Sequence, residues 1–493
     1  MVALFAALTL LAQAAPADAG PSLNVNRPSE DSMFGSGESA PEDAAVKPAI
    51  DSSLQPLADA GVSRDEAMLE SRFPYKTTDQ LPPDNPLTIG GLLYLRAQIS
   101  ATENQPPSQY QLNAPFLLDT YLDARPNDRV RAFFLVRTEY DATYVAGQAN
   151  QLGMVVPSQS NPSFFIDQMW IKFDLSRQVF ITAGKQHVKW GTAHFWFPND
   201  LLNPVRLTPL AVFDQRTGQT MVKANLPLPN QNLNVYVLAL LDGIQQANTL
   251  GKVGGAARVE YVFNAIELGL DVIAMEGQHN RYGGDVSFGL WDFDLYADGA
   301  LTNLRDNPIY EIVIPPVLNP GPGQSFFPGF YQRDKPSFYE PQVAMGLNYS
   351  FRYGNNHTVV MGGEYFYNGL GYSDPSIYPY LLANNAATFF YLGKQYAGLY
   401  ILADKPGDWY NTTINFSTLG NLSDHTFISR IDVFQTVLTH LRFEAFFDLH
   451  YGGNGEFHYG LNVPATTFGG VSIANIHITP PLFDAGLALR VSL

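Results

Sequence analysis

The fold is decided by residues 179–190, which read VFITAGKQHVKW and are followed by Gly191. Side chains alternate between the two faces of a strand, so the polar Lys185, His187 and Lys189 share one side of this segment. We expect a strand over all twelve residues. Segments with the same alternation recur along the chain, and their apolar sides take no charge. This pattern predicts a transmembrane strand of a β-barrel rather than a strand of a soluble β-sandwich.

The composition agrees with a barrel and excludes a helical membrane protein. The chain has 493 residues, of which 46% are hydrophobic and 15% charged, with 41 glycines and 35 prolines. So many helix-breaking residues leave little room for long helices, and after the N-terminus no run of about 18 apolar residues occurs. A single closed barrel accounts for the length without several soluble domains.

Charge and cysteine content restrict the partners. The formal net charge is −17, from 29 basic and 46 acidic residues, which argues against a nucleic-acid-binding face. There is no cysteine, so disulfides, thiolate metal sites and a lipidated N-terminal cysteine are excluded. This composition is compatible with an oxidising envelope compartment.

The sequence divides into three parts. Residues 1–19 have the apolar core and small-residue cleavage sites of a secretory signal peptide, although no basic residue precedes the core. Residues 20–85 are acidic, poor in periodic apolar residues, and expected to be mostly disordered in the periplasm. Within them the capping-box spacing of Ser63 and Glu66 predicts a short helix at 63–72. Residues 86–493 form the expected barrel.

The fold class expected for residues 86–493 is all-β, a closed antiparallel transmembrane β-barrel of 16–18 strands. About 18 candidate strands alternate in hydrophobicity, and short turns between them alternate with long links, as in outer-membrane barrels. The turn near Trp291 is the weakest of these predictions. Strand N–H and C=O groups in hydrocarbon need partners, so the first strand, near 88–99, should pair with the last, 483–493.

A barrel of this size is wide enough for an aqueous channel, and the strand faces opposite the apolar stripe would line it. Basic residues gather in the third to fifth predicted strands, so one wall of the pore would be positive, unless these side chains merely pair across strands. The predicted pore-lining residues are Arg96, Arg129, Arg131, Arg137, Lys172, Lys185, Lys189, Arg258, Arg352 and Arg442.

The long link at 191–218 is the candidate constriction. Its FWFP segment, residues 195–198, is too apolar to be left in water, so we expect it to fold into the lumen. The alternative is that these aromatic residues pack on the rim or against a neighbouring subunit. Folding inward would bring five residues to the constriction, namely Trp196, Asn199, Asp200, Asn203 and Arg206.

A family resemblance rests on the same region. Residues 184–191, GKQHVKWG, and residues 198–204, PNDLLNP, resemble the signature of porin-like proteobacterial outer-membrane β-barrel proteins, a poorly characterised family filed as a domain of unknown function. The resemblance implies a β-barrel in the bacterial outer membrane with a transport role. It identifies no substrate and no binding residue.

The function expected from the sequence is a porin-like channel for passive diffusion of small hydrophilic solutes or ions. No nucleophile motif and no HExxH motif occurs, so we expect no catalytic residues, no metal site and no cofactor. Expected partners are outer-membrane lipid, the solutes and the barrel-insertion machinery, for a monomer or homotrimer. The alternatives are an exporter of an envelope polymer or lipid, and a closed barrel with enzymatic or adhesive external loops.

Overall fold

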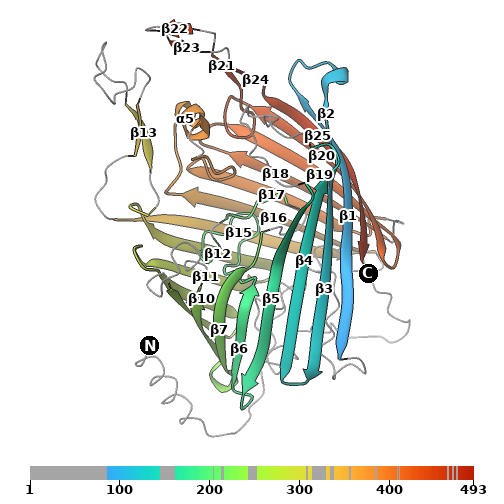
Figure 1. Cartoon of the computed structure of the whole chain (residues 1–493), viewed down its shortest axis with the longest axis vertical. Coiled ribbons are helices and arrows are strands. Elements are labelled where there is room, and N and C mark those ends of the chain that lie inside the picture. The colour runs from blue at the N-terminus through green and yellow to red at the C-terminus, as the bar shows by residue number, and fades with distance from the viewer. Residues whose placement is uncertain are drawn as a thin grey trace.

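The computed structural model describes residues 86–493 except 145–160, 204, 212–215, 242–252, 307–308, 314–328, 333–337, 355–356, 384–385, 408, 410, 464–465, 469–470, 474–475 and 493. These residues form a closed antiparallel β-barrel (Figure 1). The main sheet contains 19 strands, of which β2 (Gln111–Asn113) only extends the hairpin beside β1, so 18 strands make the wall.

The wall strands follow one another in chain order, each paired with its sequence neighbour. Their alternating polarity explains why they form, since each presents one apolar and one polar face. The strands are β1 (Leu87–Thr102), β3 (Pro115–Asn127), β4 (Val130–Asp141), β5 (Ser163–Leu175), β6 (Val179–Gln186), β7 (Gln219–Leu228), β8 (Leu233–Leu240), β9 (Gly254–Phe263), β10 (Ile266–Ala274), β11 (Arg281–Leu290), β12 (Phe293–Asn303), β15 (Tyr339–Tyr353), β16 (His357–Asn368), β17 (Gln395–Asp404), β18 (Thr412–Asn421), β19 (Thr426–Leu438), β20 (Leu441–Gly452) and β25 (Pro481–Ser492).

The ring closes between the first and the last strand, as the sequence predicted. β1 pairs with β25 from Leu92 opposite Ser492 to Thr102 opposite Pro481, and β25 pairs on its other edge with β20. With this closure the wall has no free edge, so every strand has a backbone partner on both sides.

The longest links all lie at one end of the barrel and most of the short turns at the other, as predicted. The exception is the pair of links around β18, where the turn-end link (405–411) is longer than the loop-end link (422–425). At the turn end, β11 and β12 are joined by Trp291 and Asp292 alone; Trp291 has a positive φ of 56° and is 89% exposed. The turn that the sequence predicted least clearly is therefore present, and the strand count falls at the top of the expected range.

Small elements decorate the links at the other end, the loop end. They include the 3-10 helices η2 (Pro107–Gln109) and η6 (Pro375–Ile377) and the short helix α5 (Tyr378–Ala383), while η3 (Pro229–Gln231) lies in a turn. Three small hairpin pairings are β13 (Tyr310–Val313) with β14 (Gly329–Gln332), β21 (Leu461–Val463) with β24 (Ile476–Ile478), and β22 (Thr466–Phe468) with β23 (Val471–Ile473). Within the described residues, none of the helices has the length and hydrophobicity needed to cross a membrane.

The two faces of the wall differ in chemistry. Large apolar side chains such as Leu270, Phe164 and Leu399 are 59–70% exposed on the outward face. Charged side chains such as Asp119 and Arg258 lie on the lumen face and are buried. In water, the charged side chains would be expected outside and the apolar ones inside. The outward face is therefore suited to a non-aqueous medium.

Strand β6 departs from the prediction in length and in phase. It ends at Gln186 rather than at Trp190. Its Gly184 pairs with Trp170 and its Lys185 with Met169, which is 51% exposed on the outward face. Lys185 therefore points outward, and the prediction that it lines the pore is wrong.

The outward position of Lys185 has a physical explanation. Its Nζ donates to the carbonyl oxygen of Ile166 at 2.7 Å, close to the loop end of the wall. A long lysine side chain can place its stem on apolar surface while its ammonium reaches a polar group, so alternation alone gave the wrong phase here.

Three predictions fall outside the described residues. The signal peptide at 1–19, the disordered extension at 20–85 and the short helix at 63–72 all lie before the first described residue, Pro86. They stay predictions.

The assignment of faces can be tested on β1, where Ala97 is outward and Gln98 faces the lumen opposite Gly486. The chain has no cysteine, so Ala97→Cys and Gln98→Cys each give a single labelling site. With bimane attached and the protein in liposomes, spin-labelled lipid should quench the label at 97 strongly and the label at 98 little. Equal quenching, or the reverse order, would mean that the register is shifted by one residue.

Candidate functional site

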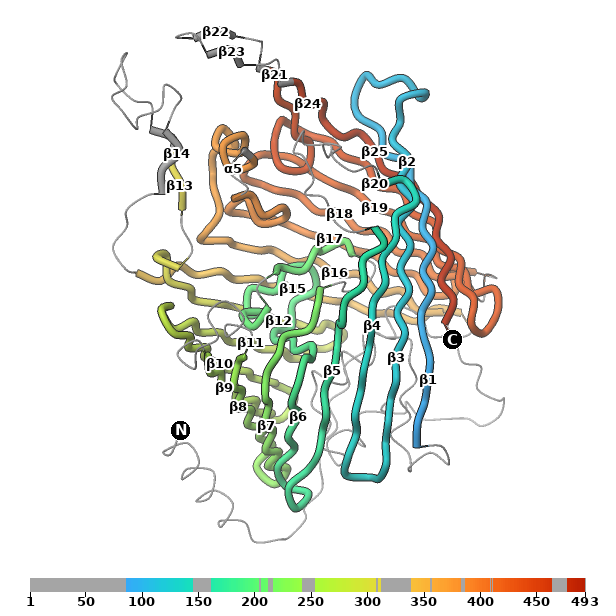
Figure 2. The backbone as a smooth tube through the Cα atoms, viewed as in Figure 1, coloured from blue at the N-terminus to red at the C-terminus, as the bar shows by residue number. Residues whose placement is uncertain are grey.

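The segment between β6 and β7, residues 187–218, enters the barrel and is called here the lumen loop. Figure 2 shows its green tube crossing the inside of the ring from β6 toward β12, β15 and β16. Both of its ends are held by Asp167 of β5, whose Oδ1 lies 2.9 Å from Nε2 of His187 and accepts a hydrogen bond from the N–H of Gly218 at 3.2 Å. One carboxylate thus fixes the entry and the exit of the loop.

Asp167 reaches the lumen because of a β-bulge. On β4, Leu135 pairs with Gln168 and Val136 pairs with Ile166, which leaves Asp167 as an extra residue on β5. Bulges redirect a side chain in this way. Asp167 also lies 3.5 Å from the guanidinium of Arg137, so the loop root is tied to the ion pairs of β3 and β4.

The middle of the lumen loop is held by Glu364 of β16, on the opposite wall. Its carboxylate accepts hydrogen bonds from three successive backbone N–H groups, those of His194 (2.7 Å), Phe195 (3.2 Å) and Trp196 (2.8 Å). The hydroxyl of Tyr296 donates to it as well, at 2.8 Å. Hydrogen bonds to an ionised acceptor are about twice as strong as neutral ones, so this contact is a strong anchor.

Aromatic packing fills the space around this anchor. The Trp196 ring stacks on Phe366 with a centroid distance of 5.7 Å, and its Nε1–H donates to the carbonyl of Phe390 at 3.0 Å. A Cβ at Gly398 would lie 2.5 Å from the ring of Phe195, so only glycine lets β17 approach the loop this closely. The apolar FWF segment is buried inside the lumen and not on the outer rim.

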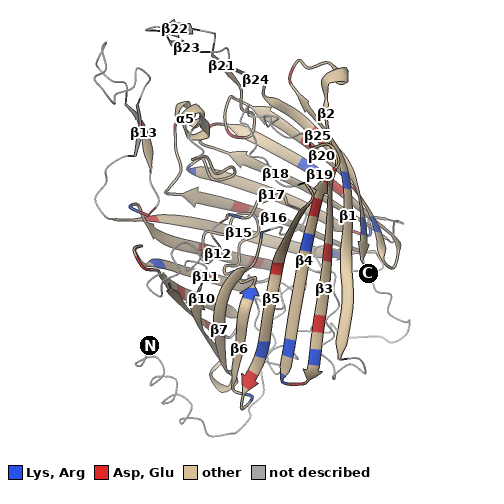
Figure 3. Cartoon of the chain, in the orientation of Figure 1, with Lys and Arg blue, Asp and Glu red and all other residues tan. Residues whose placement is uncertain are grey.

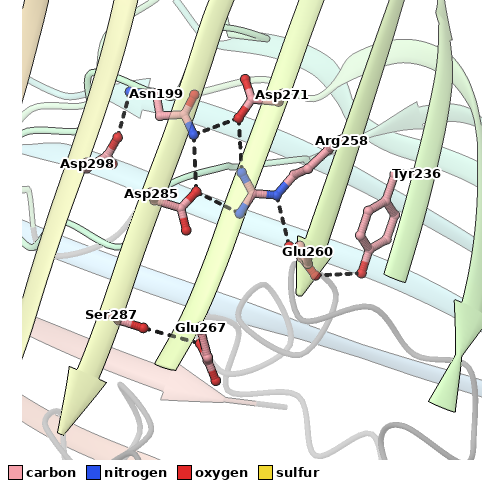
Figure 4. A network of polar contacts seen from close by, with 9 residues as sticks. All are labelled: Asn199, Tyr236, Arg258, Glu260, Glu267, Asp271, Asp285, Ser287 and Asp298. Carbon is pink, nitrogen blue, oxygen red and sulfur yellow. Dashed lines mark hydrogen bonds and ion pairs between the residues drawn. The ribbon is translucent and has the colours of Figure 1, made fainter. Parts of the chain in front are cut away.

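The next part of the loop meets a polar network on β9 to β12 (Figure 4). The backbone N–H of Asn199 donates to Asp298 at 3.1 Å, and its side-chain Nδ2 donates to Asp271 at 2.8 Å and to Asp285 at 3.2 Å. Arg258 lies between these carboxylates, 3.1 Å from Asp271 and 2.7 Å from Asp285. The sequence identified Asn199 but not its partners.

The remaining residues of the predicted constriction hold the loop in shape. Asp200 accepts hydrogen bonds from Arg216 at 2.6 Å and from Asn203 at 2.6 Å, and Arg206 donates to Gln342 of β15 at 3.1 Å. Trp196, Asn199, Asp200 and Asn203 are all buried. The structure therefore brings the five predicted residues together inside the barrel.

The predicted pore-lining residues divide into several groups. Arg137 faces the lumen but is fully buried, and Arg258 is covered by the lumen loop network. Lys189 follows the end of β6, with its Nζ 3.1 Å from the centre of the Phe197 ring. Five further predicted residues lie on strands and face the lumen according to the register, namely Arg96, Arg131, Lys172, Arg352 and Arg442.

The predicted positive wall on β4 to β6 is neutralised by acidic partners. Arg137 pairs with Asp119 at 2.8 Å and Arg131 with Asp123 at 3.0 Å. Arg129 lies in the turn before β4, half exposed, and pairs with Asp174 at 2.9 Å. Figure 3 shows acidic and basic residues side by side along β3, β4 and β5. This wall is a set of ion pairs rather than a patch of positive charge.

A second group of arginines, which the sequence did not single out as a group, lines β1, β19, β20 and β25. Arg96 and Arg430 lie over the ring of Phe446, with Cζ 4.3 and 4.5 Å from its centre. Arg442 and Arg490 lie opposite one another on β20 and β25 and approach Glu444 at 3.6 and 3.3 Å. The pairing of β25 with β1 and β20, and of β20 with β19, brings these four residues together.

Among the described residues, no three His, Cys, Asp or Glu side chains form a group that could hold a metal ion by themselves.

A buried carboxylate outside the wall is Glu456, in the link after β20. Its side chain accepts hydrogen bonds from Tyr396 (2.6 Å), Asn421 (2.9 Å) and the N–H of Leu392 (3.3 Å), and its own N–H donates to Asp424. Burial raises the pKa of Glu456 from 4.5 to about 8.

The raised pKa of Glu456 predicts a pH-dependent loop. The packed state binds the proton more tightly than the detached loop, so packing is most stable below pH 4.5. It should weaken as the pH rises to about 8, and then change no further. Hydrogen exchange of residues 453–460 should therefore speed up, beyond its intrinsic rate, between pH 5 and pH 9.

Two variants check the origin of this effect. Glu456→Gln should abolish most of the pH dependence, because the glutamine is neutral throughout. Glu276→Gln, on an exposed residue of another link, should leave it unchanged. An unaltered pH profile in Glu456→Gln would contradict the assignment.

Among solved structures, the chain is similar to OccAB4 of Acinetobacter baumannii, with 9% sequence identity, a TM-score of 0.47, and coverage of 85% of this chain and 100% of that one. It is also similar to OccAB1 of the same organism, at 11% identity and a TM-score of 0.47 over 83% of this chain and 97% of that one. A triple mutant of the Rhodopseudomonas blastica porin is matched at 9% identity and a TM-score of 0.39, over 83% of this chain and 100% of that one. No family model and no curated protein matches the chain. Similarities this weak carry no part of the function proposed below, which rests on the residues of the chain itself.

Proposed function

We propose that the protein is a porin-like channel of the bacterial outer membrane, through which small hydrophilic solutes or ions diffuse passively. The observation that supports this most is the lumen loop, which lies within a closed 18-strand barrel and is bound to its wall at Asp167, Asp298 and Glu364. A barrel of this size leaves an aqueous lumen unless something fills it. The loop is then the element that sets the width.

The passage would run beside the loop rather than through it. The loop is bound to β9 to β12 and β15 to β17, where its partners are buried. Basic residues on the other side keep part of their surface accessible, including Arg96, Arg131 and Lys172. A water-filled lumen lined by such side chains is suited to polar solutes.

Charge pairing favours small solutes over a large polymer. An exporter of an envelope polymer or lipid would need a wide and basic lumen, whereas here the lumen is occupied by the loop and its basic residues face acidic ones such as Asp123 and Glu444. We infer for the same reason that ion selectivity is weak. An enzymatic or adhesive role of the external loops is a separate alternative.

The outward apolar face supports a position in the outer membrane, since hydrocarbon is the medium in which such a face is stable. Outer-membrane lipid and the barrel-insertion machinery are the partners that this position requires, and β25 is the strand that the machinery would recognise. The protein works as a monomer or a homotrimer.

Conductance of single channels tests the proposal directly. The refolded chain in a planar bilayer should give stable conductance steps. A salt gradient should give a reversal potential close to zero, because the basic residues on the open side of the lumen are paired with carboxylates such as Asp123 and Glu444. If the heat-modifiable gel shift shows that the barrel is folded and no conductance steps are seen, the protein is not a diffusion channel.

The role of the loop is tested separately with Glu364→Gln. An amide binds the three N–H groups less well than a carboxylate, and leaving a buried polar group unsatisfied costs about 1–3 kcal/mol. The loop should therefore detach part of the time, giving larger and noisier conductance steps. Glu267→Gln removes a lumen-face carboxylate of β10, which accepts a hydrogen bond from Ser287, leaves Glu364 intact, and should keep the wild-type trace. Equal traces for all three proteins would exclude the loop as the constriction.

A further inference from the structure

The network under Asn199 carries more negative charge than its one arginine neutralises. Arg258 approaches the carboxylates of Glu260 at 2.9 Å, Asp285 at 2.7 Å and Asp271 at 3.1 Å (Figure 4). Asp298 joins the same network through the backbone N–H of Asn199. Three carboxylates therefore contact one guanidinium, and a fourth belongs to the same network through Asn199.

The arrangement of the aspartates makes this imbalance costly. Asp285 and Asp298 are directly opposite one another on β11 and β12, and both are buried. Like charges in such a cross-strand pair are destabilising, and burial adds a desolvation penalty for each charge that lacks a partner. The network calls for additional positive charge.

Three buried oxygen atoms in this network have no hydrogen-bond partner. They are Oδ1 of Asn199, Oδ1 of Asp271 and Oδ2 of Asp298. Asn199 is completely buried, and both N–H bonds of its amide are directed at Asp271 and Asp285, so its Oδ1 can only accept. Buried acceptors without a donor are rare in folded proteins, and a bound ion or water is the usual explanation.

Two of these oxygens face the same space above Gly283 of β11. The point where a Cβ on Gly283 would lie is 1.6 Å from Oδ1 of Asn199 and 2.4 Å from Oδ1 of Asp271, so the two oxygens are at most about 4 Å apart. Two acceptors at this distance repel one another unless a donor or a cation lies beside both. The absence of a side chain at Gly283 is what gives the oxygens their room.

The chemistry of the available ligands selects the kind of cation. All of them are oxygens, from carboxylates and an amide, and Ca²⁺ prefers this set. Among the described residues, the carboxylates of the network are not placed to hold a metal ion by themselves. Cation binding here therefore needs the amide oxygen of Asn199 as a further ligand. A thiolate- or imidazole-seeking metal finds no ligand among these side chains.

We propose that Asn199 of the lumen loop and Asp271 of the wall bind a hard divalent cation such as Ca²⁺, with the charge of Asp298 and Asp285 holding it nearby. The cation joins the loop to β10, and it offsets the excess negative charge that the contact buries. The site does not depend on conduction, because a barrel that is electrically silent would still contain it.

Terbium luminescence tests the site on the full-length protein, refolded in detergent and stripped with EDTA. Tb³⁺ replaces Ca²⁺ and is excited through tryptophan, and Trp190 lies beside the network with Cζ of Arg258 5.7 Å from its ring centre. The wild-type protein should give a saturable signal that Ca²⁺ displaces. Asp271→Asn and Asn199→Ala should each weaken Tb³⁺ binding by tenfold or more.

The control is Glu267→Gln, which removes a carboxylate from the lumen face of the same strand but outside the network. It should bind Tb³⁺ as the wild type does, which separates this site from general attraction to a chain of net charge −17. Asn199→Ala changes no wall strand, so it carries the test if Asp271→Asn does not fold, as judged by the gel shift.

Two results would overturn the proposal. No Ca²⁺-displaceable signal from the folded wild type would mean that water or a proton fills the space instead. Wild-type affinity in a folded Asn199→Ala protein, or equal weakening in Glu267→Gln, would mean that the ion binds elsewhere. Neither result bears on conductance, so failure of the cation site and failure of the channel are distinguishable.

Discussion

The rest of the structure depends on the backbone hydrogen bonds between β1 and β25. An antiparallel sheet with an apolar outward face has no stable edge in hydrocarbon, where an unpaired N–H or C=O finds no water. Pairing residues 92–102 with residues 481–492 removes that edge and fixes the ring. Once the ring is closed, the parity of each strand decides which side chains face inward, and every lumen contact follows from that parity.

The parity of the strands was largely predictable because it depends on local sequence, and the closure was predictable because unpaired backbone groups are costly in hydrocarbon. Turn residues and two-residue alternation mark each strand, and even the two-residue turn at Trp291 was identified. Parity failed at Lys185, where a long side chain on the outward face satisfies its ammonium at a backbone carbonyl. It failed also beyond Gln186, where Val188 and Trp190 are apolar because they pack inside the lumen and not against lipid. An apolar side chain indicates an apolar environment, and inside this barrel the packed lumen loop provides such an environment as well as lipid does outside.

The candidate site was predictable on one side only. The apolar FWFP segment predicts a loop that is buried, and the loop does lie inside the barrel. Its partners, Glu364 and Asp298, are 168 and 99 residues away from the N–H groups that they bind at Trp196 and Asn199. On their own strands they look like ordinary lumen carboxylates. Only the ring, which brings β12 and β16 across from β6, makes them anchors, and no local pattern contains that information.

The same partners explain why loop and wall form one unit. Peptide N–H groups at 194–196 would be buried without acceptors if the wall were apolar, and carboxylates such as Glu364 would be buried without donors if the loop were elsewhere. Each side satisfies groups that are costly to bury alone. Moving the loop therefore costs free energy on both sides at once. A constriction built in this way is held by the charge of the wall, so the residues that shape the lumen are also those that keep its loop in place.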